Sequence, residues 1–179
     1  SMATHRCLPL SFESIKTLVT EHGYDAAMKD LTGLVLCGGQ GRRMGGEDKP
    51  LLQAGGGALV QAVLSRLDGQ VKTTLISCRP ESASRYERFG ARLVHDRIDD
   101  GGPLAGIAAG LDASSADWCL VCPGDSPVFP DDLASELWAR RREAPVLYVE
   151  NQFLFMLVRV TCAAGLNRWL MGGGRKVQD

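Results

Sequence analysis

A glycine-rich segment with three cations is the part of this sequence best suited to chemistry. It follows the apolar run Leu34–Leu36 and reads Cys-Gly-Gly-Gln-Gly-Arg-Arg-Met-Gly-Gly-Glu-Asp-Lys-Pro over residues 37–50. Because glycine has no Cβ, backbone N–H groups in such a segment can approach a phosphate chain closely. Arg42, Arg43 and Lys49 add positive charge. The segment therefore predicts a binding site for a nucleoside triphosphate.

Two common phosphate-binding motifs do not match this segment. The dinucleotide motif G-x-G-x-x-G requires a third glycine at a position that Met44 occupies here. The P-loop requires Ser or Thr after its lysine, whereas Pro50 follows Lys49. These failures argue against dinucleotide oxidoreductases and P-loop hydrolases. The plain alternative, a surface turn with solvated arginines, is disfavoured by the number of glycines and cations that follow one apolar run.

Two aspartates follow other apolar runs. Asp96 comes after Leu93–Val94, and Asp125 comes after Trp118–Cys122 within Pro-Gly-Asp-Ser-Pro. A carboxylate just past a buried strand suits Mg²⁺, which binds one or two carboxylates together with phosphate oxygens and water. An aspartate that bonds its own turn backbone is the structural alternative. The glycine-rich segment favours the metal, and we expect it at Asp125.

Strand-like and helix-like patterns alternate from Thr32 onward. Strands are expected over 34–36, 73–76, 93–94, 118–122, 146–149 and 153–158, and helices over 59–67, 81–89, 104–111, 131–142 and 161–170. This alternation predicts an α/β fold with a mostly parallel sheet and helices on both faces. Ligands bind such sheets at the carboxyl ends of the strands, so the glycine-rich segment, Asp96 and Asp125 should share one cleft.

Residues 1–30 differ from the remainder of the chain. Phe12, Ile15, Leu18 and Val19 follow a helical spacing, and Gly23 could end that helix. We therefore expect a helical N-terminal extension over residues 1–30 and one main domain over residues 31–179. The main domain is long enough for a sizeable core of its own.

Composition narrows the possible functions. The 179 residues are 45% hydrophobic, with a formal net charge of −1, which argues against a general nucleic-acid binder. No apolar stretch approaches membrane-spanning length, and no secretion signal is recognisable at the N-terminus, so we expect a cytoplasmic protein with reduced thiols.

Cys119 and Cys122 match the metal-binding pattern C-x-x-C. In a strand, however, residues three apart point to opposite faces, so these two thiols should not share a metal.

Three blocks of the sequence together resemble one enzyme family. The first spans Leu36–Lys49, the second is His95-Asp96 followed by Gly-Pro-Leu-Ala-Gly over 102–106, and the third is Cys-Pro-Gly-Asp-Ser-Pro over 122–127. Their order and spacing resemble the molybdenum cofactor guanylyltransferases, the MobA family. The resemblance implies a Rossmann-like nucleotidyltransferase fold. It also implies transfer of GMP from GTP to molybdopterin, which forms a guanine dinucleotide cofactor and pyrophosphate.

The resemblance also implies roles for particular residues. The nucleotide-binding residues it implies are Leu36, Cys37, Gly38, Gly39, Gly41, Lys49, Asp96 and Asp125. By their chemistry, Lys49 and the magnesium ion at Asp125 would stabilise the reacting phosphate during catalysis, and Arg43 would hold the pyrophosphate portion. The implied partners are GTP, molybdopterin, and cofactor-insertion proteins or molybdoenzymes, without nucleic acid or membrane.

The sequence departs from the family pattern in three places: at Cys37, in the run Ile76–Arg79, and at its C-terminal part (172–179), which is shorter than the family usually has. Cys37 stands where the family usually has Ala, which would make its thiol a target for alkylation that GTP blocks. The run Ile76–Arg79 lacks an Asn that commonly helps at the nucleotide. Three alternatives therefore stay open: a molybdopterin cytidylyltransferase, a sugar-phosphate nucleotidyltransferase, and a nucleotide-binding accessory protein without turnover.

Overall fold

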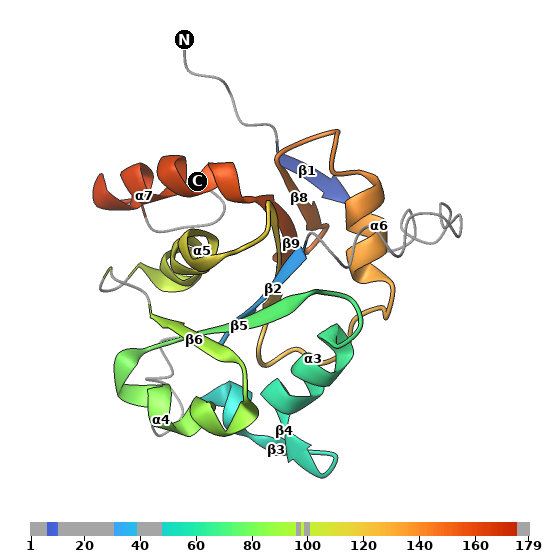
Figure 1. The fold of residues 1–179 in the computed structure, drawn as a ribbon, viewed down its shortest axis with the longest axis vertical. Coiled ribbons are helices and arrows are strands. Elements are labelled where there is room, and N and C mark those ends of the chain that lie inside the picture. Colours follow the sequence, from blue (N-terminus) through green and yellow to red (C-terminus); the bar gives the residue numbers. More distant parts are fainter. Residues whose placement is uncertain (1–6, 11–30, 39–47, 96–97, 99–100, 175–179) are drawn as a thin grey trace.

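A seven-stranded sheet organises the chain (Figure 1). The computed structural model describes residues 7–10, 31–38, 48–95, 98 and 101–174. The strands are, in sheet order, β1 (Cys7–Leu10), β8 (Val146–Val149), β9 (Gln152–Arg159), β7 (Trp118–Pro123), β2 (Leu31–Leu36), β5 (Thr73–Cys78) and β6 (Arg92–His95). Only β9 runs antiparallel to its neighbours. The predicted α/β fold with a mostly parallel sheet is confirmed.

Helices cover both faces of this sheet (Figure 1). One face packs against α3 (Leu59–Leu67) and α6 (Leu133–Ala139), and the other against α5 (Gly102–Ala113) and α7 (Ala163–Met171). The short helix α4 (Ala83–Tyr86) follows β5. The remaining elements are the 3₁₀ turns η1 (Lys49–Leu51), η2 (Pro80–Ser82), η3 (Glu87–Phe89) and η4 (Val160–Cys162), and the small pair β3 (Gln53–Ala54) and β4 (Gly57–Ala58).

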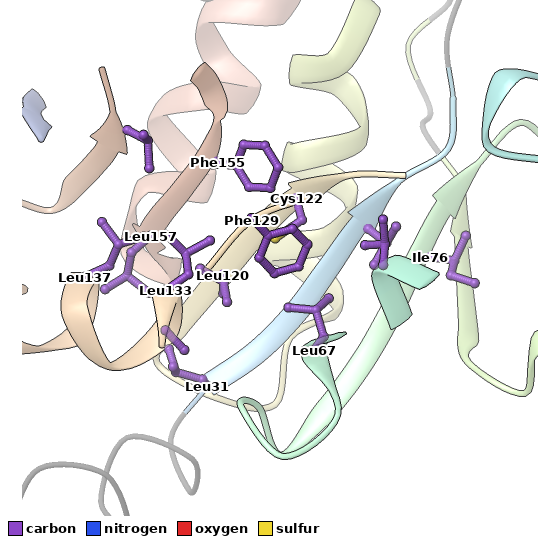
Figure 2. Packing of buried hydrophobic residues seen from close by; sticks show 14 of the residues in the cluster. Leu31, Leu67, Ile76, Leu120, Cys122, Phe129, Leu133, Leu137, Phe155 and Leu157 are labelled. Carbon is purple, nitrogen blue, oxygen red and sulfur yellow. The ribbon is translucent and has the colours of Figure 1, made fainter. Parts of the chain in front are cut away.

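The alternation of side chains along β7 divides the core in two. Cys119 belongs to the cluster under α5 and α7, whereas Cys122 belongs to the cluster under α3 and α6. In Figure 2, Phe129 and Phe155 lie close to Cys122, and their ring centroids are 5.2 Å apart. The prediction that the two thiols face opposite ways is confirmed. Burial raises the pKa of the Cys119 thiol to about 11, which keeps it protonated.

The order of the strands locates a crevice. From β2 the chain adds β5 and β6 on one side and then returns to place β7 on the other side. In doubly wound sheets, ligands bind at the carboxyl ends of the strands where this order reverses. Here the reversal lies between β2 and β7, whose last residues, Leu36 and Pro123, stand opposite each other. The glycine-rich segment follows Leu36, and the segment that carries Asp125 follows Pro123, so the two predicted parts of the site start side by side.

Some elements differ from the sequence-based expectation. Residues 7–10 form β1, which pairs with β8 in parallel, whereas a strand was not expected within residues 1–30. The predicted helix around Phe12–Val19 lies outside the described residues. The helix expected over 131–142 is shorter, with bounds Leu133–Ala139. Among the described residues, no helix combines the length and hydropathy of a membrane span.

Candidate active site

A cavity of about 310 Å³ lies at the carboxyl ends of β2 and β7. Its lining consists of Leu36, Cys37, Gly38, Asp48, Lys49, Pro50, Pro103, Pro123, Asp125 and Leu154. Five of the predicted site residues thus meet at one place: Leu36, Cys37, Gly38, Lys49 and Asp125. The other four, Gly39, Gly41, Arg43 and Asp96, lie outside the described residues. Their roles stay predictions.

The end of β2 is held by backbone hydrogen bonds on both sides. The amide of Gly124 donates to the carbonyl of Leu36 at 2.9 Å, and the amide of Cys37 donates to the carbonyl of Ser77 at 2.7 Å. The hydroxyl of the buried Tyr86 donates to the carbonyl of Cys37 at 3.4 Å. The backbone of residues 36–37 therefore enters the cavity in one fixed position, which suits binding without reorganisation.

Gly124 lets the segment before Asp125 pass close to β2. A Cβ on Gly124 would lie 2.6 Å from Cys37 Sγ, 3.0 Å from the Leu36 carbonyl oxygen and 3.3 Å from Pro50 Cβ. Real carbon and sulfur atoms do not approach so closely, so a side chain at this position must displace its neighbours. Glycine here is a requirement of packing between the two walls of the cavity.

Gly124→Ala is accordingly expected to lower the free energy of unfolding by about 1–3 kcal/mol through overpacking. The second change Cys37→Ala should recover part of this loss, because it removes the sulfur atom at 2.6 Å but leaves the other two contacts. Urea titration of the single and double variants measures both effects. Gly165→Ala is the control, since a Cβ on that α7 residue meets nothing within 4 Å and should be neutral or stabilising. Equal stability of Gly124→Ala and wild type would contradict the packing argument.

Asp125 is partly buried at the start of a loop anchored at its far end. Its Oδ1 accepts a hydrogen bond from the Ser126 hydroxyl at 3.2 Å. Further along, Arg66 Nη1 donates to the Phe129 carbonyl and to Asp131 Oδ1, each at 2.6 Å. These two bonds tie the far end of the loop to α3. At its start, the hydrogen bond from Ser126 engages only Oδ1 of Asp125, so Oδ2 can bind another ligand.

Lys49 owes its position to the Asp-Lys-Pro sequence. Asp48 precedes the turn η1, Lys49 begins it, and the amide of Leu51 donates to the Asp48 carbonyl at 2.8 Å. Pro50 fits the second position of such a turn because its missing N–H is not needed there. The Lys49 side chain is exposed at the cavity, and among the described residues no carboxylate lies within ion-pair distance of it.

Sequence reasoning missed five lining residues, namely Asp48, Leu154 and the prolines Pro50, Pro103 and Pro123. Asp48 adds a second acidic residue to the lining, and Leu154 adds an apolar residue from β9. The tripeptide Asp-Lys-Pro contained a signal for Asp48, since a neighbour of a phosphate-binding lysine is close to the same ligand. Leu154 had no such signal, because only the pairing of β9 with β7 brings it there.

Cys37 and Gly106 have structural roles. The expectation that Cys37 is open to alkylation is wrong, because the residue is only 4% exposed. Burial raises the pKa of its thiol far above the ordinary value, which removes the reactive thiolate. A Cβ on Gly106 would lie 2.5 Å from Ser77 Oγ, so this glycine permits close packing of α5 on β5. Ser77, within the run Ile76–Arg79, is itself buried.

A larger hollow, about 530 Å³, opens at the opposite end of the sheet. Its lining includes Thr32 and Thr73, at the amino ends of β2 and β5, and Arg92. None of the predicted site residues lies there, and the Arg92 guanidinium donates to the Ala113 carbonyl at 3.5 Å. We therefore assign the chemistry to the smaller cavity, which lies at the carboxyl ends of the strands.

The doubly wound sheet and the cavity at its switch point, with a lysine and a carboxylate, define the class of nucleotidyltransferases with a Rossmann-like fold. The sequence profile described as "MobA-like NTP transferase domain" matches residues 33–179. This chain belongs to that family. The matched segment contains every residue of the described cavity.

Individual proteins agree with this assignment. The molybdenum cofactor guanylyltransferase of Acidovorax sp. (strain JS42) is 41% identical over 165 residues, which cover 83% of this chain and 78% of that protein. The molybdopterin-guanine dinucleotide biosynthesis protein A of Archaeoglobus fulgidus superposes with a TM-score of 0.67 at 25% identity, over 82% of this chain and 76% of that one. Rv0371c of Mycobacterium tuberculosis H37Rv, solved in complex with manganese, shares the fold with a TM-score of 0.60 at 15% identity, over 81% and 83%.

These matches confirm the predicted MobA family and the predicted enzyme class. The chain is a nucleotidyltransferase of molybdenum cofactor biosynthesis, and its relatives carry the name of the predicted activity.

Proposed function

We propose that this chain transfers GMP from Mg-GTP to molybdopterin, forming the guanine dinucleotide cofactor and releasing pyrophosphate. One observation carries the proposal: the backbone of Leu36–Gly38, the Lys49 ammonium and the Asp125 carboxylate line the same cavity at the switch point of the sheet. The name of the 41%-identical relative supports guanine as the base and the molybdenum cofactor as the acceptor.

The residues of the cavity fit a divalent cation held jointly with the substrate. The described residues contain no group of three or more His, Cys, Asp or Glu side chains that could enclose a metal. Asp125 instead offers one carboxylate with an oxygen not engaged by Ser126. Magnesium suits this arrangement, since it binds through one or two carboxylates together with substrate phosphate oxygens and water. The manganese complex of one fold neighbour is in line with a divalent cation in this fold.

The reaction requires positioning and charge neutralisation. A phosphate oxygen of molybdopterin attacks the α-phosphorus of GTP; a P–O bond forms there, and the bond from the α-phosphorus to the bridging oxygen breaks. The electron pair leaves with pyrophosphate. The bound cation would offset charge on the phosphoryl oxygens. Lys49 stabilises the same charge, while the fixed backbone of residues 36–38 orients the nucleotide. Arg43, Gly39 and Gly41 would hold the pyrophosphate portion, and Asp96 would contact the nucleotide.

A comparison of two bases tests the choice of nucleotide. Mg-GTP at about 100 times its dissociation constant should raise the thermal midpoint by about 5–10 °C, and Mg-CTP at the same concentration should not. Differential scanning fluorimetry measures both shifts. Stabilisation by CTP alone would favour a molybdopterin cytidylyltransferase instead, which the absence of Asn in Ile76–Arg79 keeps as the second candidate.

Product formation tests the reaction itself. When molybdopterin and Mg-GTP are supplied together, the protein should release one pyrophosphate for each guanine dinucleotide cofactor formed. GTP binding without pyrophosphate release would refute the proposed reaction and would favour an accessory role. The same preparation can be tested for delivery of its product to cofactor-insertion proteins or molybdoenzymes, which are the partners we propose.

A further inference from the structure

Helix α4 brings an arginine to the edge of the nucleotide cavity. Arg85 Nη1 lies 3.2 Å from Oδ2 of Asp48, the residue directly before Lys49. Arg85 is not itself among the lining residues, whereas Asp48 is. The described contact of Arg85 with the cavity lining is therefore its ion pair with Asp48.

The position of Arg85 is fixed by its neighbour in sequence. Tyr86 is fully buried, and its hydroxyl donates to the carbonyl of Cys37 in the cavity wall. Arg85 and Tyr86 thus contact the two described ends of the glycine-rich segment, one at Asp48 and the other at Cys37. The short helix α4 connects both contacts to the sheet, against which it packs at β5.

The charges around the cavity explain why such a contact matters. The described lining contains two carboxylates, Asp48 and Asp125, and one ammonium group, Lys49. A nucleoside triphosphate is a polyanion, so an uncompensated Asp48 would repel it. Asp48 would also compete with the phosphates for Lys49, the adjacent cation. The buried oxygen Asp48 Oδ2 makes no hydrogen bond, which leaves the Arg85 ion pair as its described compensation.

We propose that Arg85 is a positioning residue for the triphosphate site. By pairing with Asp48, it offsets one of the two carboxylates of the cavity and leaves the Lys49 ammonium available to the nucleotide phosphates. This inference rests on the proposed function insofar as the ligand is a nucleoside triphosphate.

A double-mutant cycle on GTP affinity tests the proposal. Arg85→Gln should raise the dissociation constant of Mg-GTP about fivefold at about 50 mM salt and less than about twofold at about 0.5 M, because the side chain is partly exposed and its charge is screened. In an Asp48→Asn background, the same change should have almost no effect. Arg85→Lys should retain most of the affinity, since it keeps the charge. Isothermal titration calorimetry measures the affinities of the four proteins of the cycle and of Arg85→Lys.

A matched control separates this effect from a general loss of positive charge. Arg88 lies on the same segment, but its guanidinium stacks on the ring of Phe89 at 4.9 Å and is not part of the cavity. Arg88→Gln should leave GTP affinity unchanged. With turnover as a second readout, Arg85→Gln should raise the KM for GTP while leaving kcat nearly constant.

Three results with the variants would overturn the proposal: an undiminished effect of Arg85→Gln in the Asp48→Asn background, an effect independent of salt, or unchanged affinity of the single variant at low salt. The binding assay contains no molybdopterin, so it is independent of the transfer reaction. If the wild-type protein binds GTP but releases no pyrophosphate with molybdopterin, the proposed function fails. The double-mutant cycle on GTP affinity still decides the role of Arg85 in that case. A wild-type protein that binds no nucleoside triphosphate refutes both.

Discussion

Asp125→Ala is expected to lower the rate of pyrophosphate release about a thousandfold or more while the protein stays folded. The carboxylate is the one metal ligand we assign, and its loss removes charge stabilisation of the reacting phosphate worth about 4 kcal/mol. The fold should survive, because Asp125 is only partly buried and its one described side-chain hydrogen bond is to the adjacent Ser126.

The measurement is single-turnover pyrophosphate release with saturating magnesium, GTP and molybdopterin, together with the urea midpoint of each variant. Asp131→Ala is the matched control, since this aspartate lies on the same loop outside the cavity, and the bond from Arg66 to the Phe129 carbonyl still anchors the loop when the Asp131 carboxylate is removed. It should keep near-normal turnover. Turnover of Asp125→Ala close to wild type in the presence of magnesium would contradict the metal assignment.

Lys49→Gln is expected to lower kcat/KM for GTP about a hundredfold, the second-largest effect. The ammonium is exposed at the cavity, and among the described residues no carboxylate neutralises it. It can therefore contribute its full charge to the phosphoryl oxygens as negative charge develops on them, and removal of one such group commonly costs two to three powers of ten, or roughly 3–4 kcal/mol.

Steady-state kinetics over a range of GTP concentrations separates the two ways in which Lys49 can act. A fall in kcat indicates stabilisation of the transition state, whereas a rise in KM alone indicates binding of the ground state. Lys72→Gln is the control, because this exposed lysine precedes β5 at the opposite end of the sheet. If Lys49→Gln and Lys72→Gln behave alike, Lys49 has no role in the reaction.

The strands that carry the site were predictable from sequence. Leu34–Leu36 and Trp118–Cys122 are unbroken apolar runs, and a parallel strand covered on both faces needs such runs. Both runs form strands, extended by a few residues to Leu31–Leu36 and Trp118–Pro123. Because the position of the site follows from where strands end, the convergence of Lys49 and Asp125 on the same cavity could be anticipated from these two segments.

Features that depend on distant pairing could not be anticipated. The strand Cys7–Leu10 is four residues long and contains Pro9, so its own sequence carries little β signal. Its pairing with β8 is a tertiary event. The ion pair of Arg85 with Asp48 is of the same kind: it joins α4 to the residue before η1, and neither sequence neighbourhood indicates the other. Arg43 and Asp96 lie outside the described residues, so the roles assigned to them stay predictions.

The order in which the strands join the sheet has a consequence for the growing polypeptide. Strands β2, β5 and β6 are successive neighbours along the chain and can pair early, but β7, which carries the second wall of the cavity, is made only after them. Contacts between segments far apart in sequence form slowly, because a long loop must first be closed. The strand β1 is synthesised first but can pair only after its partner β8, which begins at Val146, has been made. A nascent chain that ends before β7 thus has β2 but lacks the second side of the cavity, so the cavity is completed only late in folding.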